Sequence, residues 1–187
     1  MIVIVVPVHN RWELTKKFLQ SLQQQSFKEF NVVIVNDCST DETSGLLKKE
    51  FPEVDVINTS KEMWWTGSIK TGCDYALKNY KDMEFIIIAN NDVVVTDNAV
   101  EKLLTCVKDN HDTIIGSVIR NYENKDQIYD GACHINWKRF NCQQITVREN
   151  GLLFDNVDVL SGRFTMIPRN IVEILGFDAD TFPHYLG

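Results

Sequence analysis

The feature that most constrains the fold is an unbroken apolar run, Phe85 to Ala89, that is followed at once by Asn90-Asn91-Asp92. Such a run is typical of a parallel strand that is covered on both faces. Ligands of open α/β sheets bind in the crevice beyond the carboxyl ends of the strands. A carboxylate at that point can bind a hard divalent cation, and substrate phosphates usually share such a cation. The alternative is an Asn/Asp turn that precedes a helix, because these residues favour turns.

Two earlier apolar runs also end in polar clusters. The first, Ile2 to Val6, is rich in β-branched residues and predicts a buried strand that Pro7 ends, before the turn Val8-His9-Asn10-Arg11. The second, Val32 to Val35, leads into Asn36-Asp37-Cys38. Because parallel strands share one carboxyl edge, we expect the three polar clusters to lie along the same edge of the sheet.

Segments with apolar residues at helical spacing follow these runs. The first helix is expected to begin at Asn10, which forms a capping-box pattern with Glu13, and the second at Ser39, which forms one with Glu42. Strands that alternate with helices predict right-handed βαβ units. We therefore expect an α/β fold with a mostly parallel central sheet flanked by helices, in one domain of 187 residues.

Asp37 and His9 are the candidate nucleotide contacts at this edge. Because Ser39 is expected to cap the next helix, the Asp37 carboxylate is left to accept an N–H from a nucleobase or the hydroxyls of a ribose. Loss of Asp37 is then expected to weaken nucleotide binding without unfolding the domain. His9 is either a turn residue or a ring that stacks on the base. Neither a GxGxxG nor a GxxxxGK[ST] loop occurs, which weakens a dinucleotide or P-loop interpretation.

The net charge, the cysteines and the hydropathy limit the classes of function. A net charge of -7 argues against a surface built for nucleic acid or for an anionic membrane. The five cysteines are an odd number without a CxxC pair, so neither a disulfide framework nor a zinc site is indicated, and a reducing, cytoplasmic setting is inferred. No apolar run approaches the roughly 20 residues that a membrane-spanning helix needs.

Five segments, in this order and at this spacing, carry a resemblance to one family. They are Val6-Pro7-Val8-His9-Asn10-Arg11, similar to a Pro-x-Tyr-Asn start; Asn36-Asp37-Cys38-Ser39-Thr40-Asp41, similar to Asp-Asp-Gly-Ser-Thr-Asp; Trp64-Trp65-Thr66-Gly67-Ser68, similar to Trp-Trp-Gly-Gly; Asn90-Asn91-Asp92, in the place of Asp-x-Asp; and Ser161 to Arg169 with Gly176-Phe177-Asp178, similar to a Gly-Ala-Phe and Gly-Gly-Phe-Asp pair. Over nearly its whole length the chain resembles family 2 glycosyltransferases of the GT-A fold, in their rhamnosyltransferase-like branch.

The resemblance implies a nucleotide-sugar donor. The residues that it places on the donor are Pro7, Val8, His9, Asn10, Arg11, Asp37, Trp65, Gly67, Lys70, Asn90 and Asn91. Asp92 is the expected ligand of Mg²⁺ or Mn²⁺, which neutralises the diphosphate as it leaves. Lys70 is expected near the diphosphate, with a solvated helix lysine as the alternative. Trp64 and Trp65 offer flat faces for a sugar or nucleotide, or else pack in the core.

The resemblance also divides the chain into a donor half, residues 1–110, and an acceptor half, residues 111–187. Ser161, Gly162, Arg163, His184 and Tyr185 are expected on the acceptor side. The acidic residue that acts as base in the family is expected beyond Gly187, so the chain resembles the front portion of a longer protein. His184 is the weaker candidate for that base. The acceptor is expected to be a glycan or a lipid-linked sugar, and the region beyond Gly187 is a candidate for peripheral membrane association.

Three residues depart from the family pattern: Asn36 replaces an acidic residue, Cys38 replaces a glycine, and Asp92 is the one carboxylate left in the metal triplet. The expected reaction is an inverting, metal-assisted transfer of a sugar from a nucleotide-sugar. Two alternatives remain: a sugar-1-phosphate nucleotidyltransferase, which lacks support from a Gly-rich N-terminal loop, and a non-catalytic module that binds sugar-nucleotides or glycans.

Overall fold

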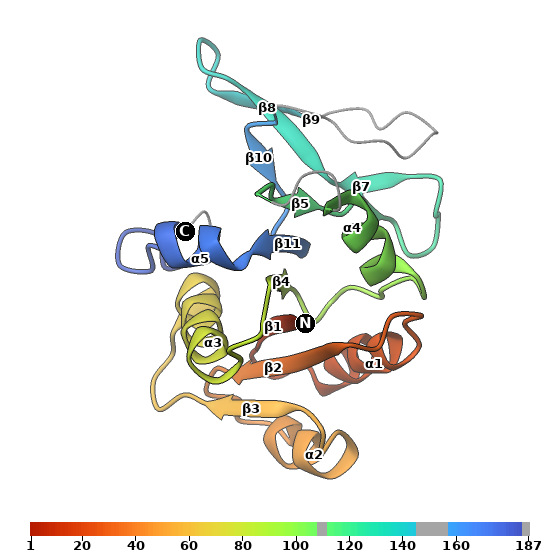
Figure 1. Ribbon diagram of the computed structural model, residues 1–187, viewed down its shortest axis with the longest axis vertical. Helices are drawn as coiled ribbons and strands as arrows, with labels where there is room; N and C mark the ends of the chain where they lie inside the picture. The colour runs from red at the N-terminus through yellow and green to blue at the C-terminus, as the bar shows by residue number, and fades with distance from the viewer. Residues whose placement is uncertain (108–111, 145–156, 185–187) are drawn as a thin grey trace.

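The computed structural model describes residues 1–107, 112–144 and 157–184, and its centre is a six-stranded sheet (Figure 1). The strand order is β3-β2-β1-β4-β11-β5. Four strands are parallel, namely β1 (Ile2–Val8), β2 (Phe30–Asn36), β3 (Asp55–Asn58) and β4 (Phe85–Ala89). Next to β4 lies the antiparallel β11 (Phe164–Pro168), which also pairs with β5 (Ile115–Gly116). The predicted α/β fold with a mostly parallel sheet is confirmed.

Helices cover both faces of this sheet (Figure 1). One core forms with α1 (Trp12–Gln23), α2 (Thr43–Glu50) and α4 (Ala99–Val107), and the other with α3 (Trp64–Asn79) and α5 (Arg169–Leu175). Side chains of β1 alternate between them: Ile2, Ile4, Val6 and Val8 enter the first core, and Val3 and Val5 the second. Because successive side chains of a strand point to opposite faces, two apolar cores require the unbroken apolar runs of the sequence.

A glycine sets how closely α3 approaches the sheet. A Cβ atom added to Gly72 would lie 2.3 Å from Cγ1 of Val5 and 3.0 Å from Cγ2 of Val35. No real Cβ atom tolerates the first distance, so a side chain at this position would push the helix off β1 and β2. The N-terminus of α3, which carries the two tryptophans, is thereby held against the carboxyl edge of the sheet.

The second half of the chain adds two small antiparallel sheets. One pairs β6 (Ile119–Arg120) with β7 (Ile128–Asp130), and the other has the order β10-β8-β9, formed by Val159–Leu160, Ala132–Asn136 and Asn141–Gln144. Strands β8 and β9 extend away from the central sheet (Figure 1). Residues Ser117 and Val118 separate β5 from β6.

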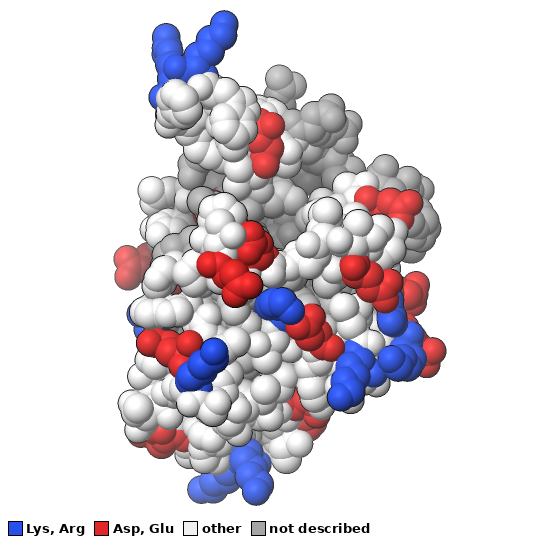
Figure 2. Space-filling view, turned by 90° about the vertical axis from the view of Figure 1, so that its left-hand side faces the viewer, with Lys and Arg blue, Asp and Glu red and all other residues white. Residues whose placement is uncertain are grey.

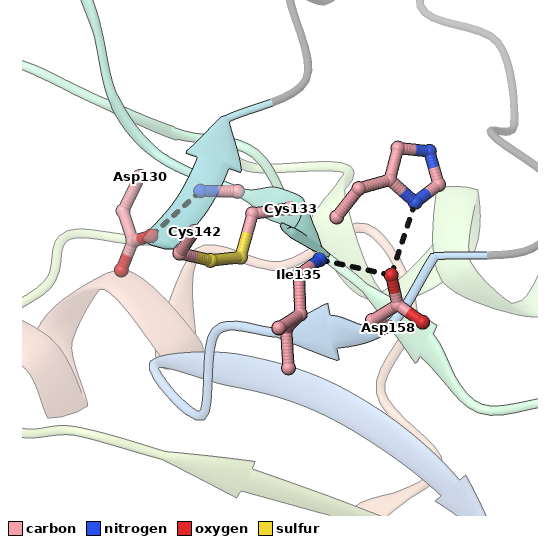
Figure 3. Close-up of a disulfide and its surroundings, with 7 residues drawn as sticks. Asp130, Cys133, Ile135, Cys142 and Asp158 are labelled. Carbon is pink, nitrogen blue, oxygen red and sulfur yellow. Dashed lines mark hydrogen bonds and ion pairs between the residues drawn. A yellow bond between two sulfur atoms is a disulfide. The ribbon is translucent and has the colours of Figure 1, made fainter. Parts of the chain in front are cut away.

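One cysteine pair contradicts the expectation from the cysteine pattern. Cys133 of β8 and Cys142 of β9 form a disulfide, with their Cα atoms 6.0 Å apart (Figure 3). Nine positions separate them in sequence, and the antiparallel pairing of β8 with β9 brings them together. The remaining cysteines, Cys38, Cys73 and Cys106, are free. A cytoplasmic setting therefore stays a prediction.

Several local expectations at the strand ends are also wrong. Strand β1 continues through Pro7 to Val8, beyond the end of its pairing with β4 at Val5. Neither predicted capping box forms, because α1 begins at Trp12 and α2 at Thr43 without a side-chain cap at either N-cap residue. The two side chains expected to cap them, Asn10 and Ser39, have other partners.

Candidate functional site

The loops after β1 and β2 bind each other at the carboxyl edge of the sheet. The backbone N–H of Asn10 donates to Oγ of Ser39 (2.8 Å), and Oδ1 of Asn10 accepts from the backbone N–H of Thr40 (2.8 Å). Nδ1 of His9 lies 2.5 Å from the backbone oxygen of Asp37. Two of the three predicted clusters are therefore joined, and the side chains expected to cap helices fasten the loops instead.

Asp37 holds the start of α3. One carboxylate oxygen accepts from Oγ1 of Thr59 (2.9 Å) and from the backbone N–H of Met63 (2.8 Å), and the other accepts from the backbone N–H of Trp64 (3.0 Å). The first N–H groups of a helix lack partners within the helix, so a carboxylate from another segment stabilises them. Asp37 is only 4% exposed, and its contact with a nucleobase stays a prediction.

Strained backbone is concentrated at this edge. Among the described residues, five non-glycine residues have positive φ, and four of them lie here: Asn10 (58°), Arg11 (63°), Cys38 (53°) and Trp64 (60°). Such conformations cost free energy and often mark functional sites. Cys38 stands where the family pattern has glycine, the residue that adopts positive φ without steric cost. The backbone geometry of the motif is thus present although its glycine is not.

Trp65 connects the start of α3 to β4 and β11. Its indole Nε1 donates to Oδ1 of Asn90 (2.8 Å). Its ring lies against Gly162, where a Cβ atom would come within 2.8 Å of the indole. The backbone N–H of Asn90 in turn donates to the backbone oxygen of Arg163 (3.0 Å). The Trp-Trp, Asn-Asn-Asp and Ser-Gly-Arg segments, which are far apart in sequence, therefore meet.

Asp92 faces a guanidinium. Nη1 of Arg163 lies 3.5 Å from Oδ1 of Asp92, and Nε of Arg163 lies 3.3 Å from Oδ2 of Asp130. Asp130 was not expected in the site, since no local pattern around Tyr129-Asp130-Gly131 indicates that it lies near Asp92. The neighbouring Asn91 points elsewhere, because its amide donates to Oγ1 of Thr15 on α1 (2.9 Å).

The remaining expected donor residues are less available to a ligand. The Val8 side chain is buried in the core, and a Cβ atom added to Gly67 would lie 3.2 Å from Cβ of Met63. Pro7 is half-buried within β1. Lys70 is exposed and forms an ion pair with Asp74 on its own helix (2.6 Å).

On the acceptor side, the ring of His184 packs against that of Trp64, with centroids 4.1 Å apart. The backbone oxygen of Pro183 accepts from the N–H of Thr66 (3.1 Å). Tyr185 lies outside the described residues. His184, the weaker candidate for the base, is thus engaged in packing at the start of α3.

A groove of about 2210 Å³ adjoins these strand ends. Its walls include Asp92 and Arg163 at the carboxyl edge, and Tyr129 and Leu160 from the second half of the chain. On the face covered by α3 and α5, acidic and basic side chains are interspersed (Figure 2). The groove is large enough for a sugar chain and opens next to Asp92.

The surroundings of Asp92 bear on whether a metal ion fits there. Among the described residues, no three His, Cys, Asp or Glu side chains gather closely enough to hold an ion. Mg²⁺ commonly keeps several waters and takes one or two carboxylates together with substrate phosphates. Asp92, whose side chain is 35% exposed, fits the part of a single protein ligand to such an ion.

The carboxyl edge of the sheet lies within a segment that matches a known protein family. A family model described as glycosyl transferase family 2 matches residues 3–176. The chain belongs to this family. The match includes the segments that meet at the carboxyl edge, whereas the rhamnosyltransferase-like branch stays a prediction.

Curated relatives share short or distant similarity with this chain. A glycosyltransferase, GlyA of Streptococcus pneumoniae, is 44% identical over 54 residues, which are 29% of this chain and 8% of that protein. The poly(ribitol-phosphate) β-N-acetylglucosaminyltransferase TarS of Staphylococcus aureus is 26% identical over 114 residues, 60% of this chain and 20% of TarS. A GalNAc(5)-diNAcBac-PP-undecaprenol β-1,3-glucosyltransferase of Campylobacter jejuni is 23% identical and is covered to 37%. The chain thus spans well under half of each relative.

Solved structures share the fold. The crystal structure of S. aureus TarS 1–349 is matched with a TM-score of 0.63 and 18% identity, over 92% of this chain and 48% of that one. A mannosyltransferase from Pyrobaculum calidifontis, in complex with GDP-Man and Mn²⁺, is matched with a TM-score of 0.64 and 13% identity, over 94% and 46%. The predicted GT-A fold is confirmed, and this fold accommodates a divalent ion in one neighbour. None of the described helices is both long and apolar enough to span a bilayer.

Proposed function

We propose that the chain is a nucleotide-sugar-binding and transfer domain, which moves a sugar to a glycan or lipid-linked acceptor with inversion at the anomeric carbon. The observation that carries this proposal is the continuous set of contacts at the carboxyl edge. It runs from His9 through Asp37 and the start of α3 to Trp65, Asn90 and Arg163. Family membership supports the reaction class.

In this proposal the donor lies across the carboxyl ends of β1, β2 and β4. His9 and Arg11, both exposed, are in position to contact the base and ribose. Asp37 contributes chiefly by holding the start of α3, because its oxygens already accept from internal donors. Asn90, oriented by Trp65, is assigned to the ribose or the donor sugar.

Asp92 is the residue to which we assign Mg²⁺ or Mn²⁺. When bound, such an ion would neutralise the diphosphate leaving group. The chain itself supplies one exposed carboxylate, so the remaining ligands are expected from the diphosphate and from water. The affinity for the diphosphate donor is therefore expected to depend only moderately on the metal ion.

The acceptor is assigned to the groove next to Asp92. Gly162 and Arg163 lie on its wall, and Ser161 supports it by donating to Asp130 (2.7 Å). An acceptor hydroxyl in the groove would lie close to the donor sugar, as a direct displacement requires. The catalytic base is not assigned to any described residue.

A thermal-shift panel of nucleoside diphosphates and nucleotide sugars, with and without Mn²⁺, tests the proposal first. The nucleoside diphosphate of one nucleobase is expected to raise the melting temperature, and the matching nucleotide sugar is expected to be hydrolysed slowly by water to the free sugar and that nucleoside diphosphate. Asn90→Ala should reduce both effects, whereas the matched control Asn79→Ala, at the exposed end of α3, should reduce neither. No shift with any nucleotide would overturn the proposal, and a shift without turnover, even with acceptors, would favour the non-catalytic module.

A further inference from the structure

We propose that Arg163 is a built-in counter-cation of the donor site: it neutralises Asp92 when no metal ion is bound, and it pairs with the donor diphosphate. The second part rests on the proposed function, whereas the first part does not. Arg163 was expected only on the acceptor side, and the structure joins it to the residue expected to hold the metal.

The backbone fixes where the Arg163 side chain begins. Its carbonyl oxygen accepts from the N–H of Asn90 (3.0 Å), and β11 continues from this point as the neighbour of β4. The side chain therefore starts beside Asn90-Asn91-Asp92, and its Nη1 reaches 3.5 Å from Asp92. Any diphosphate bound next to Asp92 would also lie within reach of the guanidinium.

Contacts on its other side hold the guanidinium in place. Oδ2 of Asp130 lies 3.3 Å from Nε of Arg163 and accepts from Oγ of Ser161 (2.7 Å), while Oδ1 of Asp130 accepts from the N–H of Gly131 (2.8 Å). The ring of Tyr129 lies 5.3 Å from Cζ of Arg163, within cation–π range. The Arg163 side chain is still 28% exposed, so a ligand can reach it.

The chemistry of a guanidinium suits this position. It has five N–H donors in a planar fork, stays protonated, and matches phosphate oxygens in pairs. Within the part of the chain that the structure describes, the contacts to Asp92 and Asp130 use Nη1 and Nε, which leaves the donors of Nη2 for a phosphate. Without Arg163, two carboxylates would face an incoming diphosphate, and like charges repel.

Another basic side chain expected at the diphosphate does not take this place. Lys70 is paired with Asp74, one turn further along α3. A divalent ion at Asp92 would have to share that carboxylate with Arg163 or displace it. The strength of metal binding is therefore set in part by Arg163.

Titration with Mn²⁺ alone, followed by electron paramagnetic resonance, tests the counter-cation role without any nucleotide. Arg163→Gln is expected to bind Mn²⁺ at least about tenfold more tightly than the unmodified chain, since a competing charge is gone. The gain should disappear in Arg163→Gln/Asp92→Asn and should be absent in the control Arg139→Gln, an exposed arginine on the β8–β9 turn. Equal Mn²⁺ affinity of Arg163→Gln and the unmodified chain would overturn this role.

Calorimetry with UDP and GDP, in Mn²⁺ and in EDTA, tests the diphosphate contact. The unmodified chain is expected to lose less than about tenfold in affinity in EDTA, because a charge-assisted hydrogen bond from Arg163 remains. The loss of affinity in EDTA should be at least about ten times larger for Arg163→Gln than for the unmodified chain, and intermediate for Arg163→Lys. The same loss in the unmodified chain and in Arg163→Gln would overturn the contact. Absence of binding in every variant would overturn the proposed function together with the contact, while the Mn²⁺ titration still decides the counter-cation role.

Discussion

The two halves of this chain, for which we propose a donor role (donor half) and an acceptor role (acceptor half), are built from different kinds of contact. In residues 1–107, the parallel strands β1, β2 and β4 bury apolar side chains on both faces, and the loops after β1 and β2 are held together by side chains. Among the described residues of the second half (112–144 and 157–184), short strands of two to five residues form two small antiparallel sheets besides β5 and β11, and large aromatic side chains stay exposed. These are Tyr122 (76%), Tyr129 (59%), Trp137 (69%) and Phe140 (87%). In the proposed function, the first half presents the donor site, and the exposed surface of the second half is available for an acceptor.

The largest loss of stability is expected when the hydrogen bonds that Asp37 accepts are removed. Asp37→Ala leaves three internal donors without their carboxylate, and hydrogen bonds to a charged group contribute about 1.5–3 kcal/mol. We expect the free energy of unfolding, from urea titration, to fall by about 3 kcal/mol or more. This reverses the expectation from the sequence, in which Ser39 capped the next helix and Asp37 was free. Unchanged stability with lost nucleotide affinity would restore the original interpretation.

A pair of matched glycine substitutions compares the packing of the two halves. Gly72→Ala brings Cβ to 2.3 Å from Val5, whereas Gly131→Ala meets no atom within 4 Å. Overpacking costs about 1–3 kcal/mol, and uncrowded surface changes stay within about 0.5 kcal/mol. We expect the first variant to melt clearly below the second in calorimetric scans. Equal melting temperatures would mean that α3 adjusts its distance from the sheet.

A double-mutant cycle on Trp65 and Asn90 tests the link between α3 and β4. Trp65→Phe removes the indole donor and keeps most of the ring. The hydrogen bond is expected to contribute about 0.5–1.5 kcal/mol to unfolding, and the loss should not add to that of Asn90→Ala. Additive losses in urea titration would show that the two side chains act independently.

The smallest effect on overall stability is expected from the disulfide. Cys133→Ser/Cys142→Ser opens a link within one hairpin of the acceptor half, so the change should stay local. Hydrogen exchange should become faster at the amides of β8 and β9 and remain unchanged at those of β1 and β4. Faster exchange in the donor half would show that the two halves unfold together.

Much of the donor half could be predicted, because its signals are local. The apolar runs gave strands, and parallel topology brought their polar ends to one edge. Which partner each polar side chain takes was not predictable in the same way. Asn10 and Ser39 lie in sequence patterns suited to helix capping. Their side-chain oxygens instead accept hydrogen bonds from backbone N–H groups of the adjacent loops.

The acceptor half could be predicted only in part, since its contacts depend on how its strands pair. Asp130 reaches the site through Arg163, which is 33 positions further along the chain. The Cys133–Cys142 pair follows from the register of β8 and β9, which cysteine spacing alone does not reveal. Arg163 itself was identified by family resemblance, but its pairing with Asp92 depends on β11 lying beside β4.

The central claim is that a nucleoside diphosphate binds at the carboxyl edge of the parallel strands. Chemical-shift mapping by NMR, with ¹⁵N-labelled protein and increasing UDP or GDP, tests it most directly. Saturable shifts are predicted for the amides of His9, Arg11 and Cys38, for the Trp65 indole and for the Arg163 side chain, with little change in β8 and β9. Shifts confined to residues 119–144, or no saturable shift with either nucleotide, would contradict the account.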